Sequence, residues 1–265
     1  MRAVERAVRS LPPDGDVGMT TTDLPADARD VATAAARDAG AILRDRLRHA
    51  RTIDFKGTVD LVTDVDRASE TLIASRIRGA FPGHRLIAEE GARGASTDGL
   101  AAPEYGWVVD PLDGTTNYAH GYPHFAVSIA LERRGTVVLG VVYDPMRDEL
   151  FVAERGRGAT LNGEPIRVST VDRLIRGLLA TGFPYDIEQR AENSAIWDIF
   201  LNASQGTRRD GAAALERADE RDVVGVLEVA ADGNAACDPR HDADESFEAL
   251  REVHRRRLAF ERRVR

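Results

Sequence analysis

Apolar residues recur every three or four positions in two stretches near the start of the chain. The recurrence between residues 27 and 49 runs through an alanine-rich segment and predicts an amphipathic helix. A second stretch between residues 66 and 81 has the same period, and Pro82-Gly83 ends it. The pattern therefore predicts two helices, each of which buries one face.

Short apolar runs separated by turn residues follow these helices and predict strands. The first two runs are brief, and each leads directly into acidic residues. The next three alternate with turns and predict one antiparallel sheet, after which a hairpin is expected at residues 158–164. A further helix is expected at residues 189–204. The predicted strands are 86–88, 107–109, 125–131, 137–143, 150–153 and 178–182.

The composition narrows the class of protein. The chain has 265 residues, is 43% hydrophobic and 30% charged, and is typical of a globular protein with one large or two smaller domains. Its net charge of −8 argues against nucleic-acid binding, and no apolar run is long enough to span a membrane. A single cysteine, Cys237, and the lack of a secretory signal indicate a cytoplasmic protein. We expect a disordered extension at residues 1–18, a domain at 19–170 and a second domain at 171–265.

Carboxylates gather at the ends of the first two predicted strands. Glu89 and Glu90 follow the first strand, and Asp110 and Asp113 follow the second. Hard oxygen ligands of this kind, with a backbone carbonyl available at Leu112, suit Mg²⁺ or Mn²⁺. The two strand ends therefore predict a metal site.

The residues directly after these acids, Gly114, Thr115 and Thr116, are expected to open a helix. The free N–H groups and the positive dipole end of a helix N-terminus bind anions. Each piece alone has an ordinary explanation, because Glu89-Glu90 could lie in a solvated loop and Asp113-Gly114 in a turn. Metal ligands and an anion site at one point together indicate a site for phosphate esters.

Further segments accompany these acids along the chain, and as a set they resemble the inositol monophosphatase family. The segments are Val59-Asp60-Leu61-Val62-Thr63 with Asp66, Ile87-Ala88-Glu89-Glu90, Asp110-Pro111-Leu112-Asp113-Gly114-Thr115-Thr116-Asn117, His124-Phe125-Ala126-Val127-Ser128-Ile129-Ala130, Tyr143-Asp144-Pro145, Ala180-Thr181-Gly182-Phe183-Pro184-Tyr185-Asp186 and Arg208-Arg209-Asp210-Gly211-Ala212-Ala213-Ala214-Leu215. The family is part of the larger group of lithium-sensitive, Mg²⁺-dependent sugar phosphatases. The resemblance implies an α+β fold, a layered α-β-α-β-α sandwich whose C-terminal part is incomplete or altered.

The resemblance also implies a role for individual residues. Two or three Mg²⁺ ions, or Mn²⁺ in their place, would be held by Glu89, Asp110, Asp113 and the carbonyl of Leu112. Glu89 would orient or deprotonate the attacking water with the help of Glu90. Thr115, paired with Asp66, would help to polarise that water. The substrate would be bound by Asp113, Gly114, Thr115 and Ala213, with the backbone N–H groups of Gly114 and Thr115 holding the phosphate.

The resemblance stops after Leu215. The family continues with an apolar helix and then a Trp-Asp-x-Ala-Ala-Gly motif whose aspartate is a metal ligand. Here a charged segment follows instead, and no such motif is present in the sequence.

The function implied is that of a Mg²⁺-dependent phosphomonoesterase that hydrolyses inositol 1-phosphate or a related small sugar phosphate with metal-activated water. Fructose 1,6-bisphosphate, histidinol phosphate and 3′-phosphoadenosine nucleotides are alternative substrates. The alternative function is that of a catalytically impaired or inactive relative, frameshifted or truncated, whose tail serves as an interaction segment. We expect a homodimer that binds a small phosphate ester and neither nucleic acid nor a membrane.

Overall fold

A computed structural model describes most of the first two thirds of the chain and parts of the remainder. The described residues are 24–47, 53–55, 61–88, 103–167, 169–171, 173–181, 194, 197–198, 200–212, 214, 225–229 and 235–236. The chain divides into two compact units, Met1–Ile166 and Arg167–Arg265, where the sequence had placed the boundary near residue 170. The extension expected at residues 1–18 and Cys237 lie outside the described residues. Within the described part, no helix combines the length and the apolar character that crossing a membrane requires.

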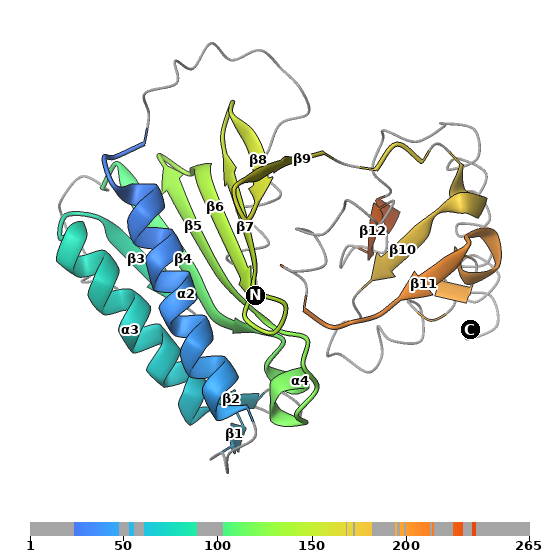
Figure 1. The fold of residues 1–265 in the computed structure, drawn as a ribbon, viewed down its shortest axis with the longest axis horizontal. Helices are drawn as coiled ribbons and strands as arrows, with labels where there is room; N and C mark the ends of the chain where they lie inside the picture. Colours follow the sequence, from blue (N-terminus) through green and yellow to red (C-terminus); the bar gives the residue numbers. More distant parts are fainter. Residues whose placement is uncertain are drawn as a thin grey trace, which may run out of the picture. The chain divides into compact units, whose positions relative to one another are not determined.

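The first unit is built on a seven-stranded sheet in the order β3-β4-β5-β6-β7-β8-β9 (Figure 1). β3 runs parallel to β4, and every later neighbour in the sheet is antiparallel, as expected for the three central strands. The hairpin expected at residues 158–164 is formed by β8 and β9. The bounds are β3 Arg85–Ala88, β4 Tyr105–Asp113, β5 Ala126–Arg133, β6 Thr136–Asp144, β7 Glu149–Glu154, β8 Gly158–Leu161 and β9 Glu164–Ile166.

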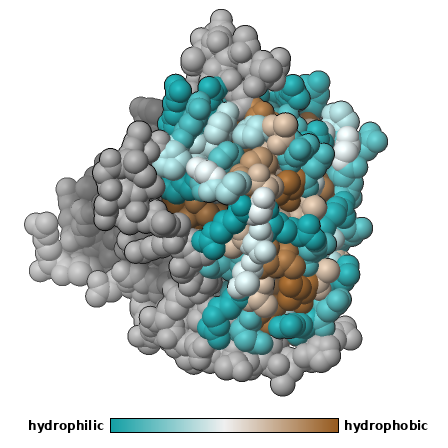
Figure 2. Space-filling model, turned by 90° about the vertical axis from the view of Figure 1, so that its left-hand side faces the viewer, coloured by the Kyte–Doolittle hydropathy of each residue, from teal (hydrophilic) through white to brown (hydrophobic). Residues whose placement is uncertain are grey.

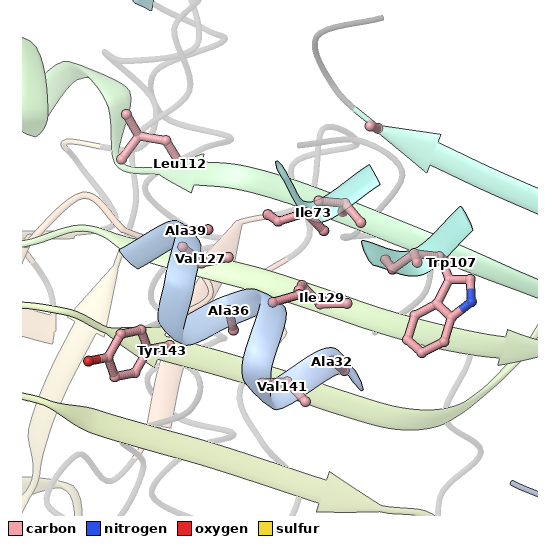
Figure 3. Packing of buried hydrophobic residues seen from close by; sticks show 14 of the residues in the cluster. Ala32, Ala36, Ala39, Ile73, Trp107, Leu112, Val127, Ile129, Val141 and Tyr143 are labelled. Carbon is pink, nitrogen blue, oxygen red and sulfur yellow. The ribbon is translucent and has the colours of Figure 1, made fainter. Parts of the chain in front are cut away.

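Two helices, α2 (Ala28–Arg46) and α3 (Asp64–Ala80), lie side by side against this sheet, in agreement with the apolar pattern (Figure 1). α2 packs its alanines over β5 and β6, and small side chains allow its backbone to approach the sheet closely (Figure 3). Gly40 marks the tightest point, because a Cβ added there would lie 2.5 Å from the Tyr143 ring. The labelled core residues in this layer are Ala32, Ala36, Ala39, Val127, Ile129, Val141 and Tyr143.

The outer face of the helix layer is largely polar. Seen from the side where α3 lies, hydrophilic residues surround smaller hydrophobic areas (Figure 2). Exposed positions of α3 include Arg67, Thr71 and Arg76, while its buried face carries Asp66, Ser69 and Ile73. α3 is therefore amphipathic, but its buried face includes polar residues near its start.

An aromatic cluster lies between the C-terminal end of α3 and the start of β4. The His84 ring stacks between Phe81, at 4.8 Å between centroids, and Tyr105, at 5.0 Å. Trp107 Nε1 donates a hydrogen bond of 3.1 Å to His84 Nδ1. Burial lowers the pKa of His84 below its ordinary value of 6.5, because desolvation disfavours the charged ring. The cluster therefore disfavours the charged form of His84.

A short hairpin precedes α3, and the sequence had indicated only a turn and a short stretch there. β1 (Ile53–Phe55) pairs with β2 (Leu61–Thr63) in antiparallel register, and α3 begins at the next residue, Asp64. A short helix of this unit, α4, spans Thr115–Ala119 and follows β4 after a single residue, Gly114.

The second unit contains a smaller sheet in the order β11-β10-β12-β13. β10 (Leu178–Thr181), the expected strand, lies between β11 (Gly206–Arg208) and β12 (Gly225–Val229) and is parallel to both. β13 (Ala235–Ala236) is antiparallel to β12, and a 3₁₀ turn, η1, spans Leu174–Arg176. The described residues within the helix expected at 189–204 are helical up to residue 203. β12 and β13 follow Leu215 and were not predicted.

Candidate metal and phosphate site

The site is built around the C-terminal end of β4. Asp110 and Asp113 both lie on this strand, and each is only 7% exposed. Pairing with β5 shifts register between them, because Pro111 has no N–H to donate to the ladder. An unbroken strand would direct residues three apart to opposite faces, and the irregularity removes that constraint between Asp110 and Asp113. The prediction that the strand stops before Asp110 is wrong, since β4 continues through Asp113.

Hydrogen bonds inside this segment fix the first carboxylate and the backbone. The backbone N–H of Leu112 donates to Asp110 Oδ1 at 3.1 Å. The Thr115 hydroxyl donates to the carbonyl oxygen of Leu112 at 3.0 Å. The Leu112 carbonyl, predicted to be a metal ligand, is therefore hydrogen-bonded to the Thr115 hydroxyl, predicted to take part in catalysis.

Thr115 also reaches α3. Its Oγ1 lies 3.4 Å from Asp66 Oδ1, and Asp66, in the first turn of α3, is only 2% exposed. A hydroxyl has one proton, so it donates to one of its two acceptors, Asp66 or Leu112, at a time. The pairing of Thr115 with Asp66, expected from the sequence, is geometrically available.

Gly114 turns the chain from β4 into α4. Its φ of 91° and ψ of 33° lie in the left-handed region, which a glycine occupies without the steric cost that a Cβ brings. The turn places the N–H groups of Gly114 and Thr115 at the beginning of α4. Because α4 has only five residues, a phosphate there depends on those N–H groups more than on a helix dipole.

Three of the predicted site residues, Glu89, Glu90 and Ala213, lie outside the described residues. β3 ends at Ala88, whose register partner on the parallel strand β4 is Val109, one residue before Asp110. Of the predicted set, hydrogen bonds link Thr115 with Asp66, Thr115 with the Leu112 carbonyl, and the Leu112 N–H with Asp110. Asp113 and Gly114 lie between Leu112 and Thr115 in the chain.

The described donors can be tested against a divalent ion. Among the residues that the structure describes, no three His, Cys, Asp or Glu side chains form a group that could hold a metal. The donors present are two nearly buried carboxylates, Asp110 and Asp113, and the Leu112 carbonyl. Mg²⁺ prefers oxygen, and one or two carboxylates with waters and substrate phosphates are its usual protein shell. The chemistry of these donors fits Mg²⁺.

One residue that contacts the β4 segment from another element was missed by the sequence analysis. Ser69, on α3, donates a hydrogen bond of 2.9 Å from its hydroxyl to the carbonyl oxygen of Pro111. The sequence did contain a signal for this contact. Ser69 lies three residues after Asp66 and four before Ile73, which places a polar side chain on the buried face of the predicted helix.

The fold and the site together define an α+β protein with an oxygen-donor site at a strand end. A family model described as the inositol monophosphatase family matches residues 25–219. Nus factor SuhB of Vibrio cholerae is 43% identical over 190 residues, which cover 70% of this chain and 69% of that protein. Inositol monophosphatase 2 of Solanum lycopersicum is 49% identical over 152 residues, 57% of each chain.

A solved structure agrees with these matches. The inositol monophosphatase of Anabaena superposes with a TM-score of 0.63 at 42% identity, covering 75% of this chain and 73% of that one. This chain belongs to the inositol monophosphatase family. The resemblance inferred from the sequence motifs is confirmed, and so is the α+β fold.

Proposed function

We propose that this protein is a Mg²⁺-dependent phosphomonoesterase that hydrolyses inositol 1-phosphate or a related small sugar phosphate. The observation that carries the proposal is the position of the Thr115 hydroxyl, within reach of Asp66 and the Leu112 carbonyl beside the buried Asp110 and Asp113. The enzyme names of the relatives from Solanum lycopersicum and Anabaena support the same class of activity.

The metal would be held by Asp110, Asp113 and the Leu112 carbonyl. Glu89 is a further metal ligand predicted from the sequence. Bound Mg²⁺ supplies charge neutralisation at the phosphate and a lowered pKa for the attacking water. When the Thr115 hydroxyl donates its hydrogen bond to Asp66, the Thr115 oxygen keeps a lone pair that can accept a hydrogen bond from that water. This arrangement would orient the water without making Thr115 a nucleophile.

The phosphate would be held by the N–H groups of Gly114 and Thr115 while the water attacks phosphorus in line. The bond to the sugar oxygen would break as the new P–O bond forms. The sugar oxygen would gain one proton and the attacking water would lose one, to Glu89 as the resemblance implies. The chain's contribution is mainly to position and to stabilise charge, because little covalent chemistry is required of the protein.

The test compares the wild type with Asp110→Asn and Asp113→Asn, which remove a charge but nearly preserve volume. Initial rates on inositol 1-phosphate are measured over a Mg²⁺ titration, with fructose 1,6-bisphosphate, histidinol phosphate and 3′-phosphoadenosine nucleotides as competing substrates. We expect hydrolysis to require Mg²⁺, to stop in EDTA and to be lost in both variants. Asp45→Asn, the same change at an exposed position of α2, should keep full activity. Unchanged turnover in EDTA or in either site variant would contradict the proposal.

A second candidate function is that of a catalytically impaired relative. It is favoured by the family match, which ends at residue 219, and by the missing Trp-Asp-x-Ala-Ala-Gly motif in the sequence that follows. The same assay distinguishes the two functions, because an impaired relative would bind Mg²⁺ and substrate with little or no turnover.

A further inference from the structure

Ser69 contributes a buried polar contact to the site segment from a separate element. The side chain is completely buried on α3, and its hydroxyl donates to the Pro111 carbonyl oxygen at 2.9 Å. Asp66, three residues earlier on the same helix face, reaches Thr115. One face of α3 therefore holds the segment on both sides of Asp113.

The Pro111 carbonyl lies where the sheet cannot satisfy it in the regular way. β4 pairs with β5 at Asp110 and again at Asp113, and neither intervening residue, Pro111 or Leu112, has a register partner. A buried carbonyl without a partner is costly, so a donor from outside the sheet is needed here. Ser69 supplies that donor, and Thr115 does the same for the next carbonyl.

One peptide unit of the segment is held by hydrogen bonds at both of its ends. The unit that joins Pro111 to Leu112 accepts from Ser69 at its carbonyl and donates to Asp110 Oδ1 at its N–H. A peptide unit is planar, so its C=O and N–H turn together. The Ser69 hydroxyl is thereby coupled through a rigid plane to the orientation of the Asp110 carboxylate.

We propose that Ser69 is a positioning residue of this site, which fixes the Pro111–Leu112 peptide plane and through it the Asp110 carboxylate. The inference rests on the proposed function, because its effect is expressed through binding of Mg²⁺ by Asp110 and Asp113. Removing the hydroxyl leaves the plane free to turn, and Asp110 then loses its fixed partner.

The experiment compares the full-length wild type with Ser69→Ala in two measurements. Calorimetric titration with MgCl₂ alone gives the Mg²⁺ dissociation constant, and initial rates over a Mg²⁺ series give the activation constant and kcat separately. We expect Ser69→Ala to raise both Mg²⁺ constants by about tenfold, as loss of a group that supports a metal ligand does. The kcat at saturating Mg²⁺ should change by less than about threefold, because the ligands themselves remain.

Two matched controls separate positioning from loss of a hydroxyl in general. Thr71→Ala removes an exposed hydroxyl on the same helix that bonds to the Arg67 carbonyl, and should leave all constants unchanged. Ser204→Ala removes a buried hydroxyl bonded to the Phe200 carbonyl in the second unit, and should lower Tm without changing the Mg²⁺ constants. Ser69→Cys replaces the hydroxyl by a slightly larger thiol, which is a weak donor. This variant gives the same comparison, with a smaller expected change, if Ser69→Ala does not fold.

Equal Mg²⁺ dissociation constants in the wild type and the Ser69 variant would overturn the inference, even if the variant melts earlier. A wild type that neither binds Mg²⁺ nor hydrolyses phosphate esters would overturn the proposed function instead. The two failures are therefore distinguishable in one set of measurements.

Discussion

At the scale of single residues, the site depends on a few polar side chains that are nearly excluded from water. Asp66, Asp110 and Asp113 are all at most 7% exposed; Asp66 lies 3.4 Å from the Thr115 hydroxyl, and Asp110 accepts a hydrogen bond from the Leu112 N–H. Burial makes such groups sensitive to the loss of a single partner, because an unsatisfied buried polar atom costs about 1–3 kcal/mol. Substitutions here should therefore affect activity more than their size suggests.

The first prediction concerns the Thr115 hydroxyl. Thr115→Val keeps the shape but removes the group that would orient the water, and should lower kcat by about 10²- to 10⁴-fold, the usual effect of losing a positioned proton-transfer group. Thr115→Ser keeps the hydroxyl and should retain most of the activity. Steady-state rates at saturating Mg²⁺ measure both, with Thr160→Val on β8 as a control for loss of a threonine hydroxyl. Full activity in Thr115→Val would remove Thr115 from the mechanism.

The second prediction concerns His84 and the pH dependence of stability. Its pKa is lowered in the folded protein by burial, so the unfolded chain binds the proton more readily. The contribution to stability is complete above pH 6.5 and is lost as the pH falls through the folded-state pKa. Tm should therefore fall between pH 7.5 and 5, in step with a change in Trp107 fluorescence, since protonation removes the acceptor of the Trp107 N–H.

The variant His84→Gln should flatten this part of the pH profile, whereas His120→Gln, at an exposed histidine near α4, should leave it unchanged. Thermal melts followed by circular dichroism at several pH values provide the measurement. An identical pH dependence of Tm in the wild type and His84→Gln would show that His84 is not the group responsible.

At the scale of elements, the position of the helices follows from side-chain size. α2 approaches the sheet closely because alanine and glycine face it, and the Tyr143 ring fills the space beside Gly40. α3 has no comparable restriction at Gly79, where a Cβ would meet nothing within 4 Å.

Gly40→Ala and Gly79→Ala make the same chemical change on the two helices and should have opposite effects. At Gly40 the new methyl group overlaps the Tyr143 ring, and the free energy of unfolding should fall by about 1–3 kcal/mol, as in other overpacked cores. At Gly79 the substitution should raise it by about 0.4–1 kcal/mol, because alanine restricts the unfolded chain. Urea unfolding measures both, and a neutral Gly40→Ala would show that α2 can move away from the sheet.

Much of the first unit was predictable because helix and strand periods are visible wherever one face is buried. α2, α3 and the strands from β5 to β7 follow that pattern to within a few residues. The end of β4 did not, since Asp110 and Pro111 have the composition of a loop while their backbone continues a strand with an irregular register. The bond from Ser69 to Pro111 joins residues 42 positions apart, and no local pattern could indicate it.

The second unit was predicted less well because its strands are short and their partners distant in sequence. β10 was found from its apolar run, but β11 has only three residues and includes two polar ones. β12 had a signal in Val226, Leu227 and Val229, which was outweighed by the charged segment that precedes it and by the end of the family motifs. The roles of Glu89, Glu90 and Ala213 remain predictions from the sequence.

At the scale of the whole molecule, the match to the family model extends to residue 219, well beyond the last described site residue, Thr115. All described site residues lie between Asp66 and Thr115, in the first unit, whereas the metal-ligand motif expected from the family belongs after Leu215. A divalent ion can replace a lost carboxylate by water, at a cost in affinity and geometry.

We therefore expect a turnover at least about a hundredfold below that of the Anabaena relative, which corresponds to about 2.7 kcal/mol in the barrier. Replacing the residues after Leu215 with the corresponding segment of that relative should restore the rate and sharpen the thermal melt. Parallel assays of the three proteins at saturating Mg²⁺ provide the comparison. Turnover equal to that of the relative would mean that another acid, such as Asp232 or Asp238, takes the place of the missing ligand; both lie outside the described residues.

The order of the two units along the chain also bears on how the protein is made. The first unit ends at Ile166 and β12 begins at Gly225, so 58 residues lie between them. At about 5–20 residues per second, their synthesis takes roughly 3–12 seconds. Local helices and hairpins form far faster, in about 0.1–10 μs. The local elements around the site, including α3, can therefore form before β12 exists, and a sequence change after Leu215 would alter only residues that are synthesised after the site segment.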